Sequence, residues 1–429
     1  MTYPETLSFL YSQLPMYQRV GKAAYKTDLS NTLALDAFFR HPHRHFKSIH
    51  IAGTNGKGSI AHMLAAIFQS AGYKTGLYTS PHLKDFRERI KINGSPVSKD
   101  FVVQYIERSK TIIEKIKPSF FELTVLMAFD YFAQEKIDIA IIETGMGGRL
   151  DSTNIITPLL SIITNIAYDH TYFLGNTLPE IAKEKAGIIK TNVPVIIGEK
   201  HPETMPVFQE TAHKKNTKII FAEDCFTSDY MLEDFSGKVI FNIKQNGQII
   251  YPNIILDLSG NYQKKNLITI LCTLETIRNN YQWFTIGTKA IYNGLENVTS
   301  LTGFAGRWQV LQHNPLIVLD IAHNENGLSA VFEQVRNTPY RNLHIVMGFV
   351  DDKSVDTILK LFPQNATYYF TQAQIPRALP VEILQKKAKS LNGNSYPKVK
   401  DAFLSAQKNA SRNDMILVTG STFIVAEIF

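Results

Sequence analysis

Short apolar runs alternate with amphipathic stretches along the first half of the chain. One apolar run covers residues 46–53, and the segment after it carries apolar side chains at helical spacing, at Ile60, Leu64, Ile67, Phe68 and Ala71. Further short strand-like runs follow at residues 74–80, 138–145, 159–167 and 193–199, and the last three of them are rich in isoleucine or valine. Buried parallel strands have this composition, and their alternation with helices predicts a doubly wound, mostly parallel α/β sheet.

The pattern changes near residue 217. Residues 238–256 alternate between polar and apolar on both sides of Asn246-Gly247, a pair that favours a two-residue hairpin turn. We therefore expect a small β-rich insertion over about residues 217–258, followed by a helix over residues 261–279.

A polar segment rich in glycine, serine and threonine lies at residues 297–306, and the α/β alternation resumes after it. This predicts a first domain over residues 1–296, which contains the insertion, and a smaller, Rossmann-like α/β domain over residues 297–429.

Composition narrows the choice of partners and location. The chain is 44% hydrophobic and 19% charged, which is typical of a soluble globular protein. No apolar run is long enough to cross a bilayer, and the N-terminus lacks the pattern of a secretory signal. Cys225 and Cys272 lie in unrelated contexts, which argues against a disulfide framework or a thiolate metal site. We therefore expect a cytoplasmic protein that does not bind a membrane.

The net charge of +7 is spread along the chain, without the aromatic and basic motif of a nucleic-acid-binding module. The attraction of acidic small molecules explains such a charge equally well. We therefore expect no nucleic acid among the partners.

The segment HIAGTNGKGS at residues 50–59 lies between a predicted strand and a predicted helix. It departs from the usual phosphate-binding loop, G-x-x-x-x-G-K-[ST], because Ile51 replaces the first glycine and Gly58 separates Lys57 from Ser59. Its glycines would still let backbone amides point at an anion, Lys57 could reach phosphate oxygens, and Ser59 could cap the helix. A glycine-rich turn with a surface lysine is the alternative, but the context favours a P-loop-type nucleotide site.

Three of the apolar runs lead into polar side chains. Glu143 ends one run. Asp169 and His170 follow a second, and Ser80 and His82 follow a third. Each of these could be an ordinary loop residue. Together they suggest a ligand site, because open α/β sheets bind ligands at the carboxyl ends of their strands, and a carboxylate there suits Mg²⁺.

Several motifs together resemble one family. They are GTNGKGS, TSPHL, ERIKING, FFE, ETGMGGRLDSTN, ITNIAYDH, LGNTLPEIAKEKAGIIK, the GR pair at residues 306–307, DIAHN and VTGS. Between residues 20 and 421 the chain resembles folylpolyglutamate synthase/dihydrofolate synthase, the folate branch of the Mur ligase superfamily. The shortened phosphate loop is normal in that family.

The resemblance implies a set of ATP contacts and metal ligands. It implies ATP phosphate contacts at Asn55, Gly56, Lys57, Gly58 and Ser59. It implies further ATP contacts at Asn266, Arg307 and Asp320, with His323 near them and ATP in a cleft between the domains. It also implies one or two Mg²⁺ sites, with Ser80, Glu143 and His170 as ligands.

The resemblance also implies that Lys185 carries a carbamate. A free ammonium would be repelled by Mg²⁺, whereas a carbamate presents anionic oxygens; a solvated helix lysine is the alternative. Lys57, Lys185 and His323 are then the catalytic residues, the last of them to position substrate or assist proton transfer.

For the pterin substrate the resemblance implies contacts at Phe121, Glu122, Leu123, Thr124, Leu150, Asp151 and Ser152. A core helix face explains the first four of these nearly as well. Tyr25 and Lys26 lie where a substrate loop is expected. The chain departs from the family pattern at Tyr262, Ile321 and Glu325, where histidine, glycine and proline are usual.

The implied reaction is an ATP-dependent amide ligation. A substrate carboxylate, from dihydropteroate or from the glutamate tail of a folate, would form an acyl phosphate, and L-glutamate would then displace phosphate. We expect a monomer that acts on both acceptors. Another amino-acid ligase of the Mur superfamily and an NTPase without ligase activity are the alternatives, and only a ligase should need both pterin and glutamate to release phosphate.

Overall fold

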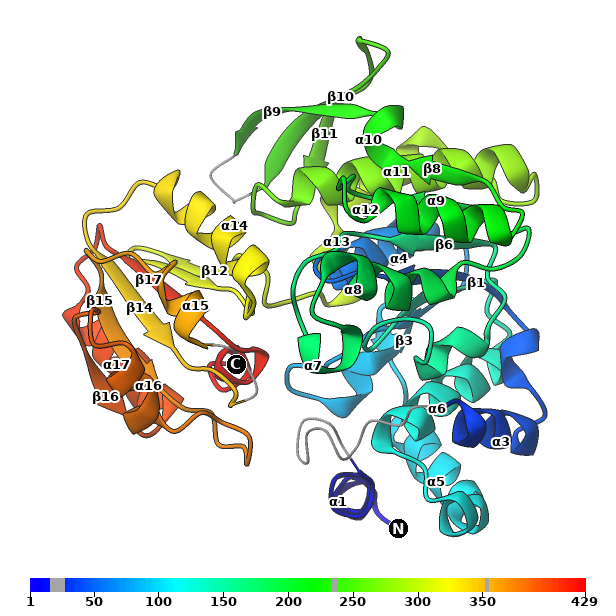
Figure 1. The fold of residues 1–429 in the computed structure, drawn as a ribbon, viewed down its shortest axis with the longest axis horizontal. Helices are drawn as coiled ribbons and strands as arrows, with labels where there is room; N and C mark the ends of the chain where they lie inside the picture. Colours follow the sequence, from blue (N-terminus) through cyan, green and yellow to red (C-terminus); the bar gives the residue numbers. More distant parts are fainter. Residues whose placement is uncertain (16–27, 234–237, 352–354) are drawn as a thin grey trace. The chain divides into compact units, whose positions relative to one another are not determined.

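A computed structural model describes residues 1–15, 28–233, 238–351 and 355–429 (Figure 1). The described chain divides into two compact units. Unit 1 comprises Met1–Asp257 and Gln263–Phe304, and unit 2 comprises Leu258–Tyr262 and Ala305–Phe429. The sequence places the boundary at residues 296–297, whereas in the structure helix α13 (Val298–Thr302) packs against α4 (Lys57–Ser70) inside unit 1.

Unit 1 is built around an eight-stranded sheet in the order β4-β3-β2-β5-β1-β6-β7-β8. The strands from β2 to β8 in this order are parallel, while β3 and β4 form an antiparallel edge. The predicted mostly parallel sheet is therefore confirmed. The strand bounds are β1 Lys47–Ala52, β2 Thr75–Tyr78, β3 Ile90–Ile92, β4 Ser95–Pro96, β5 Ile139–Glu143, β6 Leu160–Ile163, β7 Val195–Ile197 and β8 Ile219–Phe221.

Helices cover both faces of this sheet. On one side α4 packs against β1, β2 and β5, and α11, α12 and α13 pack against α4. On the other side α1, α3, α5 and α6 share an apolar cluster with β2 and β5, while α8 and α9 share one with β6 and β7. These helices span α1 Tyr3–Gln13, α3 Ser30–Phe38, α5 Lys99–Ile116, α6 Phe120–Gln134, α8 Leu178–Lys185, α9 Met205–Lys214, α11 Gln263–Asn280 and α12 Thr288–Glu296. Shorter helical turns are η2 Pro42–Arg44, η3 Phe86–Arg89, η4 Ser152–Ile155, α7 Thr171–Leu174, η5 Ala186–Ile188 and α10 Ala222–Cys225.

A three-stranded antiparallel sheet, in the order β11-β10-β9, forms the predicted insertion. Its strands are β9 Thr227–Glu233, β10 Val239–Gln245 and β11 Gln248–Leu256. The predicted hairpin is confirmed, since Gln245 pairs with Gln248 and the φ angles of Asn246 and Gly247 are 51° and 80°. The start of the predicted insertion, by contrast, belongs to the large sheet, because β8 pairs with β7.

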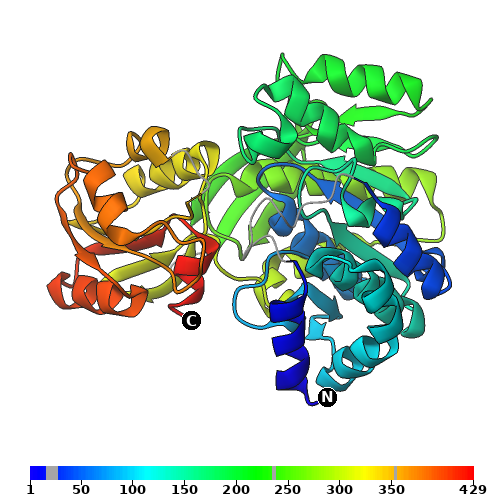
Figure 2. The same cartoon turned by 60° about the horizontal axis from the view of Figure 1, so that its bottom comes forward.

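Unit 2 holds a six-stranded sheet in the order β12-β13-β17-β14-β15-β16, which is parallel except for the edge pair β12 and β13. Helices lie on both sides of it (Figure 2). α14, α15 and α16 share an apolar cluster with the sheet, and α17 packs against β14 and β15. The bounds are β12 Gln309–His313, β13 Leu316–Leu319, α14 Glu325–Arg336, β14 Leu343–Met347, α15 Val355–Leu359, β15 Thr367–Thr371, α16 Val381–Lys387, β16 Gly393–Tyr396, α17 Val399–Asn409, β17 Met415–Thr419 and α18 Thr422–Ala426.

A second α/β unit after the sheet domain is thus confirmed. In the described part of the chain, no helix has both the length and the apolar character needed to cross a membrane.

Candidate functional site

The loop between β1 and α4 needs glycine at two positions. Gly53 has a φ of 145°, and a Cβ there would lie 1.8 Å from Thr164 Oγ1. Gly56 has a φ of 84°, and a Cβ there would lie 2.6 Å from Asn266 Oδ1. Side chains other than hydrogen are strained at such φ angles, and here they would also collide with neighbouring polar groups. The loop therefore lies directly against the end of β6 and the start of α11.

Polar contacts tie this loop to the segment after β6. The amides of Thr54 and Asn55 donate to the backbone and side-chain oxygens of Asn165, respectively, both at 2.9 Å. Thr54 Oγ1 donates to the carbonyl of Ala167 at 3.1 Å and accepts from its amide at 3.0 Å. The loop is thus held in shape by the segment that follows β6, as a preorganised anion site requires.

Helix α4 begins at Lys57, before Ser59, the residue that the sequence predicts as its cap. Its N-cap is Gly56, without a side-chain cap, so the prediction that Ser59 caps the helix is wrong. Since Gly56 turns the chain with its positive φ, Ser59 falls inside the first turn and is buried. Its hydroxyl instead accepts a hydrogen bond from Gln263 Nε2 at 3.3 Å, and Gln263 Oε1 accepts one from Asn266 Nδ2 at 2.7 Å.

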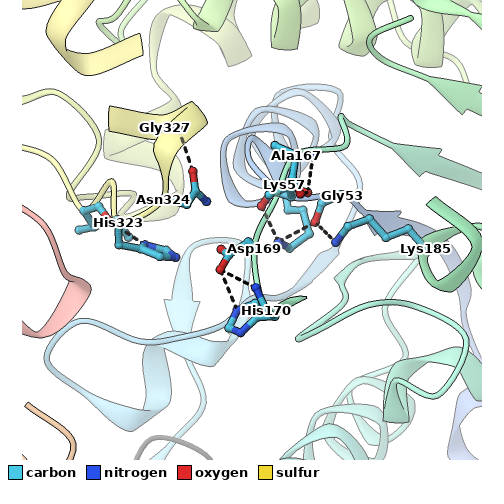
Figure 3. A network of polar contacts seen from close by, with 11 residues as sticks. Gly53, Lys57, Ala167, Asp169, His170, Lys185, His323, Asn324 and Gly327 are labelled. Carbon is cyan, nitrogen blue, oxygen red and sulfur yellow. Dashed lines mark hydrogen bonds and ion pairs between the residues drawn. The ribbon is translucent and has the colours of Figure 1, made fainter. Parts of the chain in front are cut away.

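Two lysines meet at one carbonyl oxygen of the loop (Figure 3). Lys57 Nζ donates to the carbonyls of Gly53 and Thr54, both at 3.1 Å. Lys185 Nζ, from the last turn of α8, donates to the carbonyl of Gly53 at 2.8 Å. Lys185 is only 4% exposed. Burial, together with the positive charge of Lys57, lowers the pKa of Lys185 to about 7, while Asp169 opposes the shift.

Glu143 and Ser80 lie together beside the first turn of α4. The Ser80 amide donates to Glu143 Oε2 at 3.2 Å. A Cβ built on Gly58 would lie 3.8 Å and 3.9 Å from the two Glu143 carboxylate oxygens. Glu143 is buried at the end of β5, next to the loop that carries Lys57. The structure therefore brings together Ser80, Glu143 and Gly58, three of the residues that the sequence predicts around a nucleotide.

His170 and Asp169 lie near the two lysines (Figure 3). The His170 amide donates to Asp169 Oδ1 at 2.8 Å, and His170 Nε2 is 3.8 Å from the same oxygen. His170 has a φ of 50° and is the N-cap of the short helix α7. The sequence predicts Asp169 at a strand end, but β6 ends at Ile163, so Asp169 lies in the loop after it. There it interacts electrostatically with Lys185.

The predicted metal ligands are one carboxylate, one hydroxyl and one imidazole. Among the described residues no group of three or more histidine, cysteine, aspartate or glutamate side chains is placed to hold a metal ion. Mg²⁺ does not need such a cage, since it is commonly held by one or two carboxylates together with water and substrate phosphates. The pairing of Glu143 with Ser80 against the phosphate loop fits that mode of binding.

The glycine-rich segment after β5 is anchored by Asp151. The amides of Gly145 and Met146 donate to Asp151 Oδ2 at 2.8 and 2.9 Å. The amide and hydroxyl of Thr153 donate to Asp151 Oδ1 at 3.0 and 2.6 Å. Burial raises the pKa of Asp151, while these hydrogen bonds oppose the shift. The Asp151 carboxylate therefore holds the backbone of this segment in place.

His50 completes the same network and was not predicted from the sequence. Its Nε2 lies 2.8 Å from Thr153 Oγ1, whose proton is directed to Asp151. His50 Nε2 is therefore the donor. Burial in β1 lowers the pKa of His50 to about 3, so the ring is neutral. Its position in an apolar strand gave no sign of this role, because Thr153 is distant in the sequence.

The other residues predicted to contact the pterin differ in environment. Leu123 and Thr124 are fully buried, and Thr124 Oγ1 donates to the carbonyl of Phe120 inside α6. Glu122 forms the capping box of α6, where its carboxylate accepts from the Ser119 amide at 2.6 Å. The substrate roles of all these residues stay predictions. Leu150 and Phe121 are partly exposed, Ser152 is buried, and the Phe121 ring packs on Gly145, where a Cβ would lie 2.4 Å from Cζ. Tyr25 and Lys26 lie outside the described residues.

Asp320 follows β13 in unit 2 and accepts hydrogen bonds from the residues around it. Its carboxylate accepts from the amides of Trp308 and Ala322, both at 2.8 Å, and from the Tyr262 hydroxyl at 3.1 Å. Burial raises the pKa of Asp320, and the charge of Arg307 opposes this shift. Tyr262, one of the departures from the family pattern, thus holds Asp320 through a hydrogen bond.

The remaining predicted residues of unit 2 lie close by. Arg307 Nη1 donates to the carbonyl of Gly306 at 3.3 Å. His323 Nδ1 lies 3.0 Å from the carbonyl oxygen of Ile321, so Nδ1 carries the proton. The structure therefore gathers Asp320, Arg307 and His323 at the end of β13 within unit 2.

Comparison with known proteins gives a consistent picture. The sequence matches the Mur ligase middle domain over residues 51–274 and the Mur ligase, glutamate ligase domain over residues 306–422. It is 30% identical over 443 residues to dihydrofolate synthase/folylpolyglutamate synthase of Bacillus subtilis, with 99% of this chain and 98% of that relative covered.

Two solved structures are similar over the whole chain. Escherichia coli FolC in complex with DHPP and ADP superposes with a TM-score of 0.87 at 26% identity, covering 100% of this chain and 97% of that one. Bifunctional folylpolyglutamate synthase/dihydrofolate synthase of Yersinia pestis, complexed with AMPPNP and a Mn ion, gives a TM-score of 0.83 at 25% identity, with the same coverage.

Proposed function

The chain belongs to the dihydrofolate synthase/folylpolyglutamate synthase family of Mur ligases, and from this premise we propose that it joins L-glutamate to a folate-type carboxylate with cleavage of ATP to ADP and phosphate. One observation in the structure carries this proposal. Lys57 and Lys185 converge on Gly53, at a glycine-dependent loop that has Glu143 beside its helix. Cations and backbone amides at a helix N-terminus suit a triphosphate.

Lys57 and the amides of residues 55–59 would bind the phosphates of ATP. The contact between Gln263 and Ser59 fixes the start of α11 against the loop, which supports a role for Asn266 at the nucleotide. In unit 2, Arg307 and Asp320 are the proposed ATP contacts. Because Asp320 already accepts three hydrogen bonds inside unit 2, we expect it to hold the loop around Trp308 as well.

Ser80, Glu143 and His170 are the residues that would hold Mg²⁺. When bound, Mg²⁺ would reduce the negative charge that a carboxylate meets as it approaches the γ-phosphate. The Ser80 amide already donates to one Glu143 oxygen, so it orients that carboxylate toward the loop. A relative in the same family holds AMPPNP and a Mn ion, which supports a divalent metal here.

The reaction needs no nucleophile from the protein. The substrate carboxylate attacks the γ-phosphorus of ATP, the bond to the ADP oxygen breaks, and an acyl phosphate forms. Lys57 and the loop amides stabilise the charge on the transferred group. The glutamate amine then attacks the acyl carbon, loses a proton, and phosphate leaves. His323 could accept that proton at Nε2, since its Nδ1 is protonated.

Lys185 is suited to carry a carbamate. Its amine attacks CO₂, a C–N bond forms, and the nitrogen loses one proton. Only the neutral amine reacts, and burial beside Lys57 brings the pKa of Lys185 to about 7, so that a large share is neutral at physiological pH. The modification would replace the cation beside Lys57 with an anion, which would remove its repulsion of Lys57 and of a bound metal cation.

The carbamate is tested on intact protein under native conditions. We expect wild-type protein in bicarbonate buffer to gain the mass of one CO₂, and Lys185→Met to gain none. Lys183→Met is the matched control, because Lys183 lies exposed on the same helix. An unmodified wild-type protein that is fully active without CO₂ would remove the carbamate from the proposal.

The acceptor is tested by supplying dihydropteroate and tetrahydrofolate separately, each with ATP, Mg²⁺ and L-glutamate. We expect both to yield amide products, as a bifunctional enzyme requires. Product from only one acceptor would restrict the function to that acceptor, and product from neither would overturn the proposal. A monomeric state and a cytoplasmic location stay predictions, which size measurements and cell fractionation would check.

A further inference from the structure

The two cysteines of the chain meet in space, although they lie 47 positions apart in the sequence. Cys225 ends the short helix α10, and Cys272 lies in the middle of α11. Their sulfur atoms are 3.2 Å apart. Both are free thiols. The sequence gave no sign of this pairing, because neither cysteine lies in a motif.

The two thiols differ in access. Cys272 is buried, whereas Cys225 is partly exposed. The Cys272 thiol donates to Cys225 Sγ, and this hydrogen bond lowers the pKa of Cys225. The nearby charges of Lys218, Glu275 and Asp224 also act on Cys225, the first favouring the thiolate and the other two opposing it. An accessible sulfur with a lowered pKa is the one that attacks a disulfide.

We propose that Cys225 and Cys272 form a thiol modification site that reacts with low-molecular-weight disulfides, with Cys225 as the attacking thiol and Cys272 as the resolving thiol. The proposal rests on the sulfur geometry and the difference in exposure, and it does not depend on the ligase activity.

The chemistry balances in two exchange steps. The Cys225 thiolate attacks one sulfur of the small disulfide, so that a mixed disulfide forms and one small thiolate leaves. Cys272 then loses its proton and attacks Cys225 Sγ, which releases the second small thiolate. In total, two cysteine thiols are oxidised to one disulfide, and the small disulfide is reduced to two thiols that carry the two protons. The second step needs the sulfur atoms to approach by only roughly 1 Å.

The resulting cross-link would join two parts of unit 1. β9 of the three-stranded sheet begins directly after α10, and Gln245 Nε2 of β10 already donates to Glu275 Oε2 of α11 at 3.4 Å. A disulfide one turn from Glu275 would link α10, which leads into β9, covalently to α11. It would close the chain between residues 225 and 272, which restricts the unfolded state and stabilises unit 1.

The test uses the reduced full-length protein and glutathione disulfide. We expect peptide mass spectrometry to find an internal disulfide between Cys225 and Cys272, and the melting temperature to rise on the order of 5 °C and to return on reduction. The variant Cys272→Ser should stop at a mixed disulfide between Cys225 and glutathione. Cys225→Ser should react at least tenfold more slowly than Cys272→Ser, because only the buried sulfur remains.

Three outcomes would overturn the proposal. One is the absence of the internal disulfide in wild-type protein under excess glutathione disulfide. Another is equal glutathione incorporation in the two single variants, which would remove the distinction between attacking and resolving thiols. A third is a disulfide only between two copies of the chain. Cys272→Ala replaces Cys272→Ser if the serine variant fails to fold.

Discussion

The loop that precedes α4 makes a quantitative prediction for Gly56→Ala. At a φ of 84° an alanine is strained by about 1–2 kcal/mol. Its Cβ would also lie 2.6 Å from Asn266 Oδ1, so that Asn266 has to move. Asn266 Nδ2 donates to Gln263 Oε1 at 2.7 Å in a buried position, and losing that bond costs about 1–3 kcal/mol. We expect a total loss of roughly 2–5 kcal/mol in the free energy of unfolding.

Gly72→Ala is the matched control. Gly72 has a φ of 90°, close to that of Gly56, but a Cβ there would meet nothing within 4 Å. An alanine at this position is therefore destabilising only through backbone strain, by about 1–2 kcal/mol. Part of this is offset, because alanine restricts the unfolded chain more than glycine does. The difference between the two variants isolates the collision with Asn266.

The assay combines urea unfolding, followed by far-ultraviolet circular dichroism, with calorimetric titration of a non-hydrolysable ATP analogue. We expect Gly56→Ala to be less stable than Gly72→Ala by about 1–3 kcal/mol and to bind the analogue at least tenfold more weakly. Gly72→Ala should bind it like the wild type. If the two variants were equally stable and bound the analogue equally well, the reasoning about this loop would be refuted.

Two further predictions concern buried polar groups. Urea unfolding should show that Thr153→Val lowers the free energy of unfolding by about 2–3 kcal/mol, because the variant leaves His50 Nε2–H without an acceptor and removes one donor from Asp151. Thr153→Ser keeps the hydroxyl and should keep most of that free energy. A valine variant within about 0.5 kcal/mol of the wild type would contradict the hydrogen-bond network. Burial lowers the pKa of Lys185 to about 7 in the folded protein, so above that pH the unfolded chain binds more protons at Lys185 than the folded chain does. The free energy of unfolding of the wild type should therefore rise as the pH rises from about 7 toward the ordinary pKa of lysine. In CO₂-free buffer Lys185→Met should lack this gain, and identical pH dependence in both proteins would show that Lys185 is not perturbed.

The buried strands were predictable because their sequences leave few alternatives. β1, β5 and β6 are short strands rich in isoleucine and almost entirely buried, as expected for strands that are covered on both faces. Asn246-Gly247 fixes a hairpin through its backbone preferences. Two of the edge strands, β4 and β12, gave no such signal. β4 consists of two residues, both exposed, and β12 is largely polar. Each of them pairs with a neighbouring strand on one side only.

The candidate site was predictable in its residue types but not in its local contacts. Lys57 and Glu143 lie at the loop and strand end that their positions imply. The carboxylates of Asp151 and Glu122, by contrast, are used by backbone amides in their own segments. A sequence does not reveal which of its carboxylates turn inward, because this depends on chain turns such as the one at Gly56 that moved Ser59 into the helix.

Release of phosphate from ATP, measured while pterin and L-glutamate are supplied alone and together, tests the central claim most directly. The account predicts that wild-type protein releases phosphate in step with amide product only when both are present, and that Lys57→Ala and Glu143→Ala release none. Phosphate release at the same rate with and without pterin and L-glutamate would contradict this claim, and so would full activity in either variant.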